Sequence, residues 1–307
     1  MTAVVVPGGR QDARRHPWDT RRVIDEYAGR RPRAALLPYV AWCTGYRQAG
    51  VRPAVHRGLP SPWLTMIVTL DDPLVIARHP DPRQPASAHD FLLGGLHTAP
   101  ALVTHDGRQS GIQLALTPLG ARVLLGLPAA ELASIDVEAA DVLGRLAGEV
   151  RERVLAAPDW PGRFAVLEEV LAGRLRAAQA SGSPVPRPEV SYAWDRLQRS
   201  RGAVSVADLA AETGWSPRHL GEQFRAETGL SPKAGARVVR FDRARRRLLG
   251  RQAEGGRVVL ADLAAECGYY DQAHLARDFR DLAGCPPSAL LAEELRNVQA
   301  VFQGDWE

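Results

Sequence analysis

The stretch ADLAAETGW, Ala207 to Trp215, occurs again 54 residues later as ADLAAECGY, Ala261 to Tyr269. Each copy predicts a short helix whose small alanines let another helix approach closely and whose leucine anchors it. The glycine that follows ends the helix, because glycine adopts the left-handed C-terminal cap without strain. The repeat therefore predicts two copies of one helical unit.

Both copies continue into a second helix. Ser216 and Asp271 are placed to cap it, and the next apolar residues lie four apart, as Leu220 and Phe224 do in the first copy. A helix, a glycine turn and a second helix form the helix-turn-helix pattern, whose second helix can lie in the DNA major groove. A pair of ordinary helical hairpins is the alternative, and two matched copies disfavour it.

A long helix is predicted between the two copies. It begins with the Ser231 cap and Pro232 and runs to Gly250, about 19 residues or about 28 Å. Neighbouring major-groove faces on one side of B-DNA lie about 34 Å apart. The helix also carries seven arginines against one aspartate in residues 237–251. We therefore expect a basic rod that holds two units on successive turns of one duplex.

Residues 189–292 resemble the DNA-binding domain of the AraC/XylS family of bacterial transcription regulators, which has seven helices and two helix-turn-helix units. The second unit, DLAAECGYYDQAHLARDFRDLAGCPPSAL, is especially similar to the family's signature region. The resemblance implies that Arg218, Gly221 and Glu222 face base edges. Gly221 departs from the usual long polar residue and cannot reach a base, so the first unit is expected to contact few bases.

The candidate DNA contacts follow from side-chain chemistry. An arginine suits guanine, a glutamate accepts from the cytosine amino group, and an alanine meets a thymine methyl. A solvated surface side chain is the alternative for each position. Of the arginines of the long helix, one or two are expected to contact phosphates and the others to be solvated. The predicted DNA-binding residues are Arg218, His219, Glu222, Arg225, Gln272, Ala273, His274, Arg277, Arg240, Arg243 and Arg247.

The passage SGSPVPRPE, residues 181–189, holds three prolines and a glycine between two helical patterns. Proline removes backbone donors and restricts its predecessor, which favours a linker here. The predicted divisions are a β-rich sensor and dimerisation domain with C-terminal helices at 1–180, a linker at 181–188, a DNA-binding domain at 189–296 and a tail at 297–307.

The part before the linker changes pattern once. Residues 36–117 contain short apolar or alternating runs between turn residues, which predicts an antiparallel sandwich or small barrel. From Pro118 onward the period is helical, with Asp159 and Pro161 placed to begin the last helix. These helices are expected to pack on the β module or to pair with a second subunit. The fold class is therefore α+β, followed by the all-α DNA-binding domain.

Four strand residues, Trp42, Tyr46, Trp63 and Met66, are candidates to line a ligand pocket, although such residues more often fill a core. The scattered histidines lack metal-ligand spacing, and Cys43 is expected to be a packed thiol. No motif for nucleotide binding, nucleophilic catalysis or a metalloprotease is present. We therefore expect no enzyme, no cofactor and no metal.

Composition agrees with a DNA partner. The chain has 307 residues, a formal net charge of +4 and a pI near 9.2, with no run of apolar residues long enough for a membrane span. We expect a cytoplasmic regulator that binds double-stranded DNA, with a small-molecule effector or a homodimer acting through its first domain and no membrane partner. The alternative is a small-molecule or metal-binding protein whose helical domain mediates protein contacts.

Overall fold

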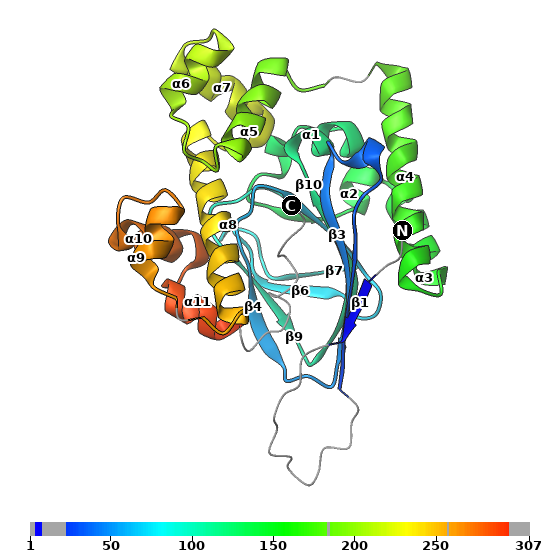
Figure 1. Ribbon diagram of the computed structural model, residues 1–307. Coiled ribbons are helices and arrows are strands. Elements are labelled where there is room, and N and C mark those ends of the chain that lie inside the picture. The colour runs from blue at the N-terminus through cyan, green and yellow to red at the C-terminus, as the bar shows by residue number, and fades with distance from the viewer. Residues whose placement is uncertain (1–3, 8–22, 183–184, 257, 295–307) are drawn as a thin grey trace.

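The chain joins a β-rich part to a helical part, as Figure 1 shows for the computed structural model, which describes residues 4–7, 23–182, 185–256 and 258–294. The predicted tail and residues 183–184 of the predicted linker lie outside the described residues. Helix α4 (Trp160–Ser181) ends and helix α5 (Pro188–Arg199) begins on either side of that linker. The predicted α+β class is thus confirmed.

Two antiparallel sheets form the β-rich part. The larger has seven strands in the order β1-β2-β3-β10-β5-β8-β11, and the smaller has four in the order β4-β9-β6-β7. Both are open, so the predicted sandwich is confirmed and the predicted barrel is wrong. The larger sheet comprises β1 (Val4–Pro7), β2 (Ile24–Arg30), β3 (Val40–Ala49), β5 (Leu64–Thr69), β8 (Phe91–Gly94), β10 (Arg108–Leu116) and β11 (Asp136–Glu138). The smaller comprises β4 (Ala54–Gly58), β6 (Leu74–Arg78), β7 (Ser87–His89) and β9 (Ala101–His105).

The two faces of the larger sheet have different neighbours because side chains alternate along a strand. Cys43 lies opposite Leu114, which lies opposite Met66 on the next strand, and all three belong to the main hydrophobic core. Their neighbours Trp42 and Ala115 also lie opposite each other and face a cavity instead. One face of the sheet therefore packs on helix, and the other faces the smaller sheet.

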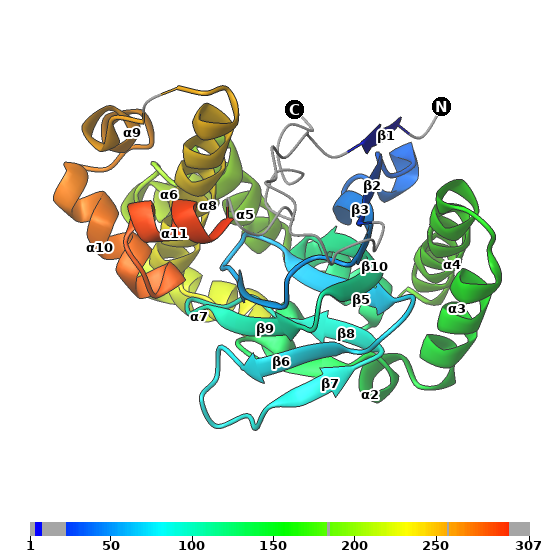
Figure 2. The ribbon, with the colours of Figure 1, turned by 90° about the horizontal axis from the view of Figure 1, so that it is seen from below.

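Helices cover the core side of the larger sheet. Figure 2 shows α3 and α4 side by side, on the side of the sheets away from the helical part. The predicted cap of α4 is confirmed, since the Gly162 amide donates to the Asp159 carboxylate at 2.8 Å. The remaining helical segments of this part are η1 (Ala34–Leu36), α1 (Pro118–Gly120), the π-helix η2 (Ala121–Leu125), η3 (Ala129–Leu132), α2 (Ala140–Leu143) and α3 (Arg145–Ala156).

The carboxy-terminal part contains the seven helices that the resemblance implied. They are α5, α6 (Val206–Thr213), α7 (Pro217–Thr228), α8 (Pro232–Ala253), α9 (Leu260–Glu266), α10 (Gln272–Ala283) and α11 (Pro287–Glu294). Helix α8 passes between the two pairs α6–α7 and α9–α10 (Figure 1). In the described part of the chain, no helix is long and apolar enough to cross a membrane.

Side-chain contacts join the helical part to the β-rich part. Arg122 of η2 pairs with Glu227 of α7 at 2.7 Å, and Arg57 of β4 pairs with Glu293 of α11 at 2.6 Å. Between them, the guanidinium of Arg246 on α8 lies 5.4 Å from the centre of the Trp63 ring. The two parts therefore meet along α7, α8 and α11.

Candidate nucleic-acid interface

The first helix-turn-helix unit is built by caps and a glycine turn. The Ser205 hydroxyl accepts from the Asp208 amide at the start of α6, and Ser216 accepts from the His219 amide at the start of α7. Between the helices Gly214 has a φ of 72°, the left-handed conformation that glycine favours. These local signals fix where α7 begins and therefore which of its side chains face outward.

The second unit repeats this construction with one difference. Asp271 accepts from the His274 amide at 2.7 Å and so caps α10, and Gly268 has a φ of 76° in the turn. Helix α9, in contrast, follows Val259, which provides no side-chain cap. Leu275 and Phe279 are fully buried at the predicted spacing of four. The predicted caps and core positions of both units are confirmed.

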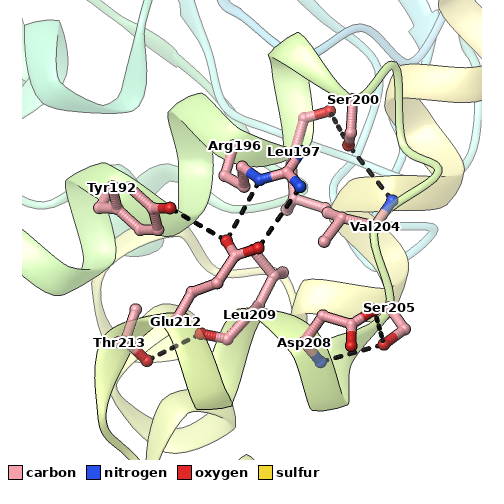
Figure 3. Close-up of polar contacts among 10 residues, drawn as sticks. All are labelled: Tyr192, Arg196, Leu197, Ser200, Val204, Ser205, Asp208, Leu209, Glu212 and Thr213. Atoms are coloured by element: carbon pink, nitrogen blue, oxygen red, sulfur yellow. Dashed lines mark hydrogen bonds and ion pairs between the residues drawn. The ribbon is translucent and has the colours of Figure 1, made fainter.

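The repeated glutamate of ADLAAE anchors each unit to the helix that precedes it. In Figure 3, Glu212 of α6 accepts hydrogen bonds from Tyr192 and Arg196, which lie one turn apart on α5. In the second unit Glu266 of α9 accepts in the same way from Arg247 and Arg251 of α8. The repeat therefore includes an electrostatic anchor that joins each first helix to its scaffold.

The predicted reading residues of the first unit lie on the exposed face of α7. Arg218, Glu222 and Arg225 are exposed, and the Nε of Arg218 donates to Glu222 at 2.9 Å. The ring of His219 lies edge-on to Trp215, with 4.7 Å between the ring centres. Gly221 is half-buried, and a side chain added there would meet no atom within 4 Å. The exposed face of α7 therefore has free space at Gly221, which carries no side chain.

The predicted residues of the second unit are placed less uniformly. Gln272, Ala273 and Arg277 are exposed on α10. His274 is half-buried, because its ring packs edge-on against Tyr269 at 5.1 Å and its Nδ1 accepts from the Tyr270 amide at 3.4 Å. Of this set, His274 therefore has a clear structural role in the turn, and its contact with a base stays a prediction.

The three arginines predicted to contact phosphates lie on one side of α8, which meets other protein groups. Arg240 donates to the Gly202 carbonyl at 3.3 Å and its guanidinium lies 5.8 Å from the Tyr269 ring. Burial lowers the pKa of Arg243, and Arg247 is paired with Glu266. These contacts join the two units to the helix between them, and phosphate binding by the three arginines remains a prediction.

Tyr270 is an exposed residue that is absent from the predicted DNA-binding set. Its side chain is 93% exposed, directly before the cap of α10. The sequence does indicate this residue, because the second copy has two tyrosines in its turn where the first has one tryptophan. Tyr269 takes the position of that tryptophan and is buried, and Tyr270 is the extra residue beside the exposed face of α10.

A cavity of about 160 Å³ lies between the two sheets. Three of the four candidate ligand residues, Trp42, Tyr46 and Trp63, line it. Met66 does not, because it is 2% exposed and lies on the opposite face of the larger sheet, in the core. The cavity brings together side chains from both sheets with Arg245 and Glu294 of the helical part.

Cys43 and His79 of the β-rich part are packed among other protein groups. Burial raises the pKa of the Cys43 thiol, which lies in the core as predicted. His79 is buried between Asp136, at 2.8 Å from its Nδ1, and Ser87, at 2.9 Å from its Nε2. Among the described residues no group of three or more potential ligands is arranged to hold a metal ion.

Comparison with known proteins matches the helical part. The family model described as "Helix-turn-helix domain" matches residues 209–293. The uncharacterized HTH-type transcriptional regulator YbfI of Bacillus subtilis (strain 168) is 29% identical over 111 residues, which are 36% of this chain and 38% of that protein. This chain thus spans less than half the length of that curated relative.

Solved structures also match. ToxT from Vibrio cholerae covers 82% of this chain and 97% of its own at 12% identity, with a TM-score of 0.46. The DNA-binding domain of AdpA, a global transcriptional factor in complex with a target DNA, covers 37% and 99% at 23% identity, with a TM-score of 0.32. From the matched family model, the carboxy-terminal part of this chain is an AraC-type helix-turn-helix domain.

Proposed function

We propose that this chain is a sequence-specific regulator of transcription that binds double-stranded DNA in two successive major grooves. The observation that carries the proposal is the placement of two matched helix-turn-helix units on either side of α8, which passes between them. At about 1.5 Å per residue its 22 residues span about 33 Å, close to the helical repeat of B-DNA, about 34 Å.

Specific contacts are assigned to the exposed faces of α7 and α10. Arg218 and Arg277 would contact guanine edges, and Glu222 would accept from a cytosine amino group. Because Gly221 brings no side chain, the first unit would contact fewer bases than α7 has positions facing the groove. The β-rich part would regulate this binding through a small effector in the cavity or through a homodimer, and the protein would act in the cytoplasm.

The test is selection of genomic DNA fragments by the purified full-length chain. We expect the retained fragments to share two short boxes about one helical turn apart. Affinity for such a fragment should fall steeply with salt concentration, since phosphate contacts release counterions. Retention of random fragments, with no shared boxes, would contradict the proposal.

A further inference from the structure

The cavity between the sheets is small enough to restrict what it can hold. Its volume, about 160 Å³, is close to that of engineered protein cavities of about 150 Å³ that bind benzene. A ligand that fills it therefore has one ring and a few substituent atoms. A long chain or a fused ring system would extend beyond this space.

The walls favour a flat aromatic ring. Trp42, Tyr46 and Trp63 supply aromatic surface, and aliphatic side chains such as Ile67 and Ile76 fill the walls between them. Aromatic rings pack well against one another in stacked or edge-on contacts. A sugar ring of the same size is a poor fit, because it carries hydroxyls on all sides and each buried hydroxyl needs a partner.

The charged groups of the lining already have partners. Arg57 pairs with Glu293, Asp136 with the His79 ring, and Arg245 donates to Asp242 at 2.9 Å. Burial raises the pKa of the fourth group, Glu294, which favours its neutral form. A charged ligand would enter without an unpaired opposite charge to receive it, at a large cost in desolvation. The lining therefore suits a neutral molecule.

The polar groups of the lining suit one or two hydrogen-bonding substituents. Thr44, Thr65 and Gln113 bring two hydroxyls and an amide to the larger-sheet side of the cavity. Gln109 is already engaged, since its amide donates to Gln48. A hydroxyl or hydroxymethyl group on the ring thus has partners on this side of the cavity.

Trp63 connects this cavity to the helix that carries both DNA-binding units. The guanidinium of Arg246 lies over the Trp63 ring at 5.4 Å, and its Nη2 is 2.8 Å from the carboxylate of Asp242. Asp242 is fully buried in the middle of α8 and also pairs with Arg245, another residue of the lining. A molecule that contacts Trp63 therefore acts on a side chain fixed to α8.

We propose that the cavity binds a neutral single-ring compound of the phenol class, and that its contact with Trp63 shifts Arg246 and so couples the cavity to α8. This coupling rests on the proposed DNA-binding function, whereas the binding itself does not. The signal passes within one chain, from the sheet to the helix between the two units.

Calorimetry on the full-length chain tests the ligand class without DNA. We expect 4-hydroxybenzyl alcohol to bind at least about tenfold more tightly than 4-hydroxybenzoate, 4-phenylphenol or glucose, which differ from it in charge, size or hydroxylation. Ala115→Leu, which adds carbon atoms on the cavity side, should abolish binding while circular dichroism and DNA affinity stay unchanged. Equal binding of a comparator, binding retained by Ala115→Leu, or no binding of the alcohol would overturn the assignment.

The coupling is tested on a DNA fragment selected by the same chain. Arg246→Gln keeps a hydrogen-bonding group for Asp242 and removes the charge over Trp63. In the wild-type chain we expect the ligand to change DNA affinity about fivefold. Arg246→Gln should bind 4-hydroxybenzyl alcohol with an affinity within about twofold of wild type, but its DNA affinity should no longer change when the ligand binds. Lys233→Gln, which removes an exposed charge of α8, should keep that change. A normal response in Arg246→Gln would overturn the coupling; failure to select any DNA sequence would instead contradict the proposed function.

Discussion

Single side chains on α7 and α10 differ in how freely they can meet a base. Arg218 is highly exposed and pairs with Glu222 one turn away, a contact that a guanine can replace at little cost because solvent already screens it. Arg277 is exposed on α10, whereas His274 is held against Tyr269. The arginines are therefore better placed to contact bases than the histidine.

Replacing Arg218 or Arg277 by alanine should lower affinity about tenfold or more for the selected fragments, with the loss confined to particular base pairs. Arg247→Ala should weaken all sequences alike, because that arginine is assigned to phosphates. Binding to a panel of single-base variants measures the difference, with Arg176→Ala, an exposed residue of α4, as control. Uniform losses for all three variants would show that the assignment of roles is wrong.

Two glycines show how local geometry decides whether a substitution by alanine raises or lowers the free energy of unfolding. Gly221→Ala places a methyl group in open space within α7 and should raise the free energy of unfolding by about 1 kcal/mol. Gly229→Ala should destabilise the chain, since its φ is +78° and the new atom would lie 2.3 Å from the Ala133 side chain. Thermal unfolding of the two variants should shift in opposite directions.

At the scale of elements, each helix-turn-helix unit is a first helix fixed to a scaffold and a second helix with a defined start. The anchors are Glu212 of α6, which binds α5, and Glu266 of α9, which binds α8. The starts are set by Ser216 and Asp271, whose side chains accept from the third amide of each helix. A cap fixes the first turn, and the first turn carries residues that are predicted to contact the bases.

Asp271→Ala should cost about 1 kcal/mol of stability in α10, because the His274 amide in the first turn loses its side-chain acceptor. Hydrogen exchange should show faster opening at the first turn of α10, and DNA affinity should fall. Asp271→Ser keeps an acceptor and should behave like wild type. Equal exchange in the alanine and serine variants would mean that the cap does not hold this turn.

At the scale of the whole molecule, ion pairs at two separate places fix the helical part against the sheets. Arg122 reaches Glu227 at the end of α7, and Arg57 reaches both Glu293 and the Ala283 carbonyl beside α10. Each DNA-binding unit is therefore held by its own contact with the β-rich part. The orientation of the two units depends on a domain interface as well as on α8.

The double variant Arg57→Gln with Arg122→Gln should loosen this arrangement. Each of these arginines makes more than one hydrogen bond across the interface, and a neutral glutamine loses the charge that strengthens those bonds. We expect a larger radius of gyration in small-angle scattering, with circular dichroism unchanged. Arg83→Gln, which removes an exposed pair within one loop, is the matched control. If the radius of gyration stays at the wild-type value, these ion pairs do not hold the two parts together.

Much of the helical part could be predicted from the sequence because its determinants are local. Caps, glycine turns and a spacing of four act within a few residues, and so the repeat located both units and their buried side chains. The same local pattern missed β2, which lies before residue 36, and β11, which lies after Pro118 where only helix was predicted, because strand pairing depends on partners distant in sequence. It also suggested a barrel, because sheet closure depends on how the last strands pair.

The sequence by itself determined that two matched helix-turn-helix units exist and which faces of α7 and α10 are exposed. Only the tertiary structure decided which groups Arg240, Arg243 and Arg247 of α8 contact. Helical spacing places these residues on one face of the helix but does not show what packs against that face. It also separated Met66 from Trp42, because alternation assigns two faces to a strand and packing decides which one borders a cavity. Above all, it placed Trp63 against Arg246, a contact between residues 183 positions apart that no local pattern encodes.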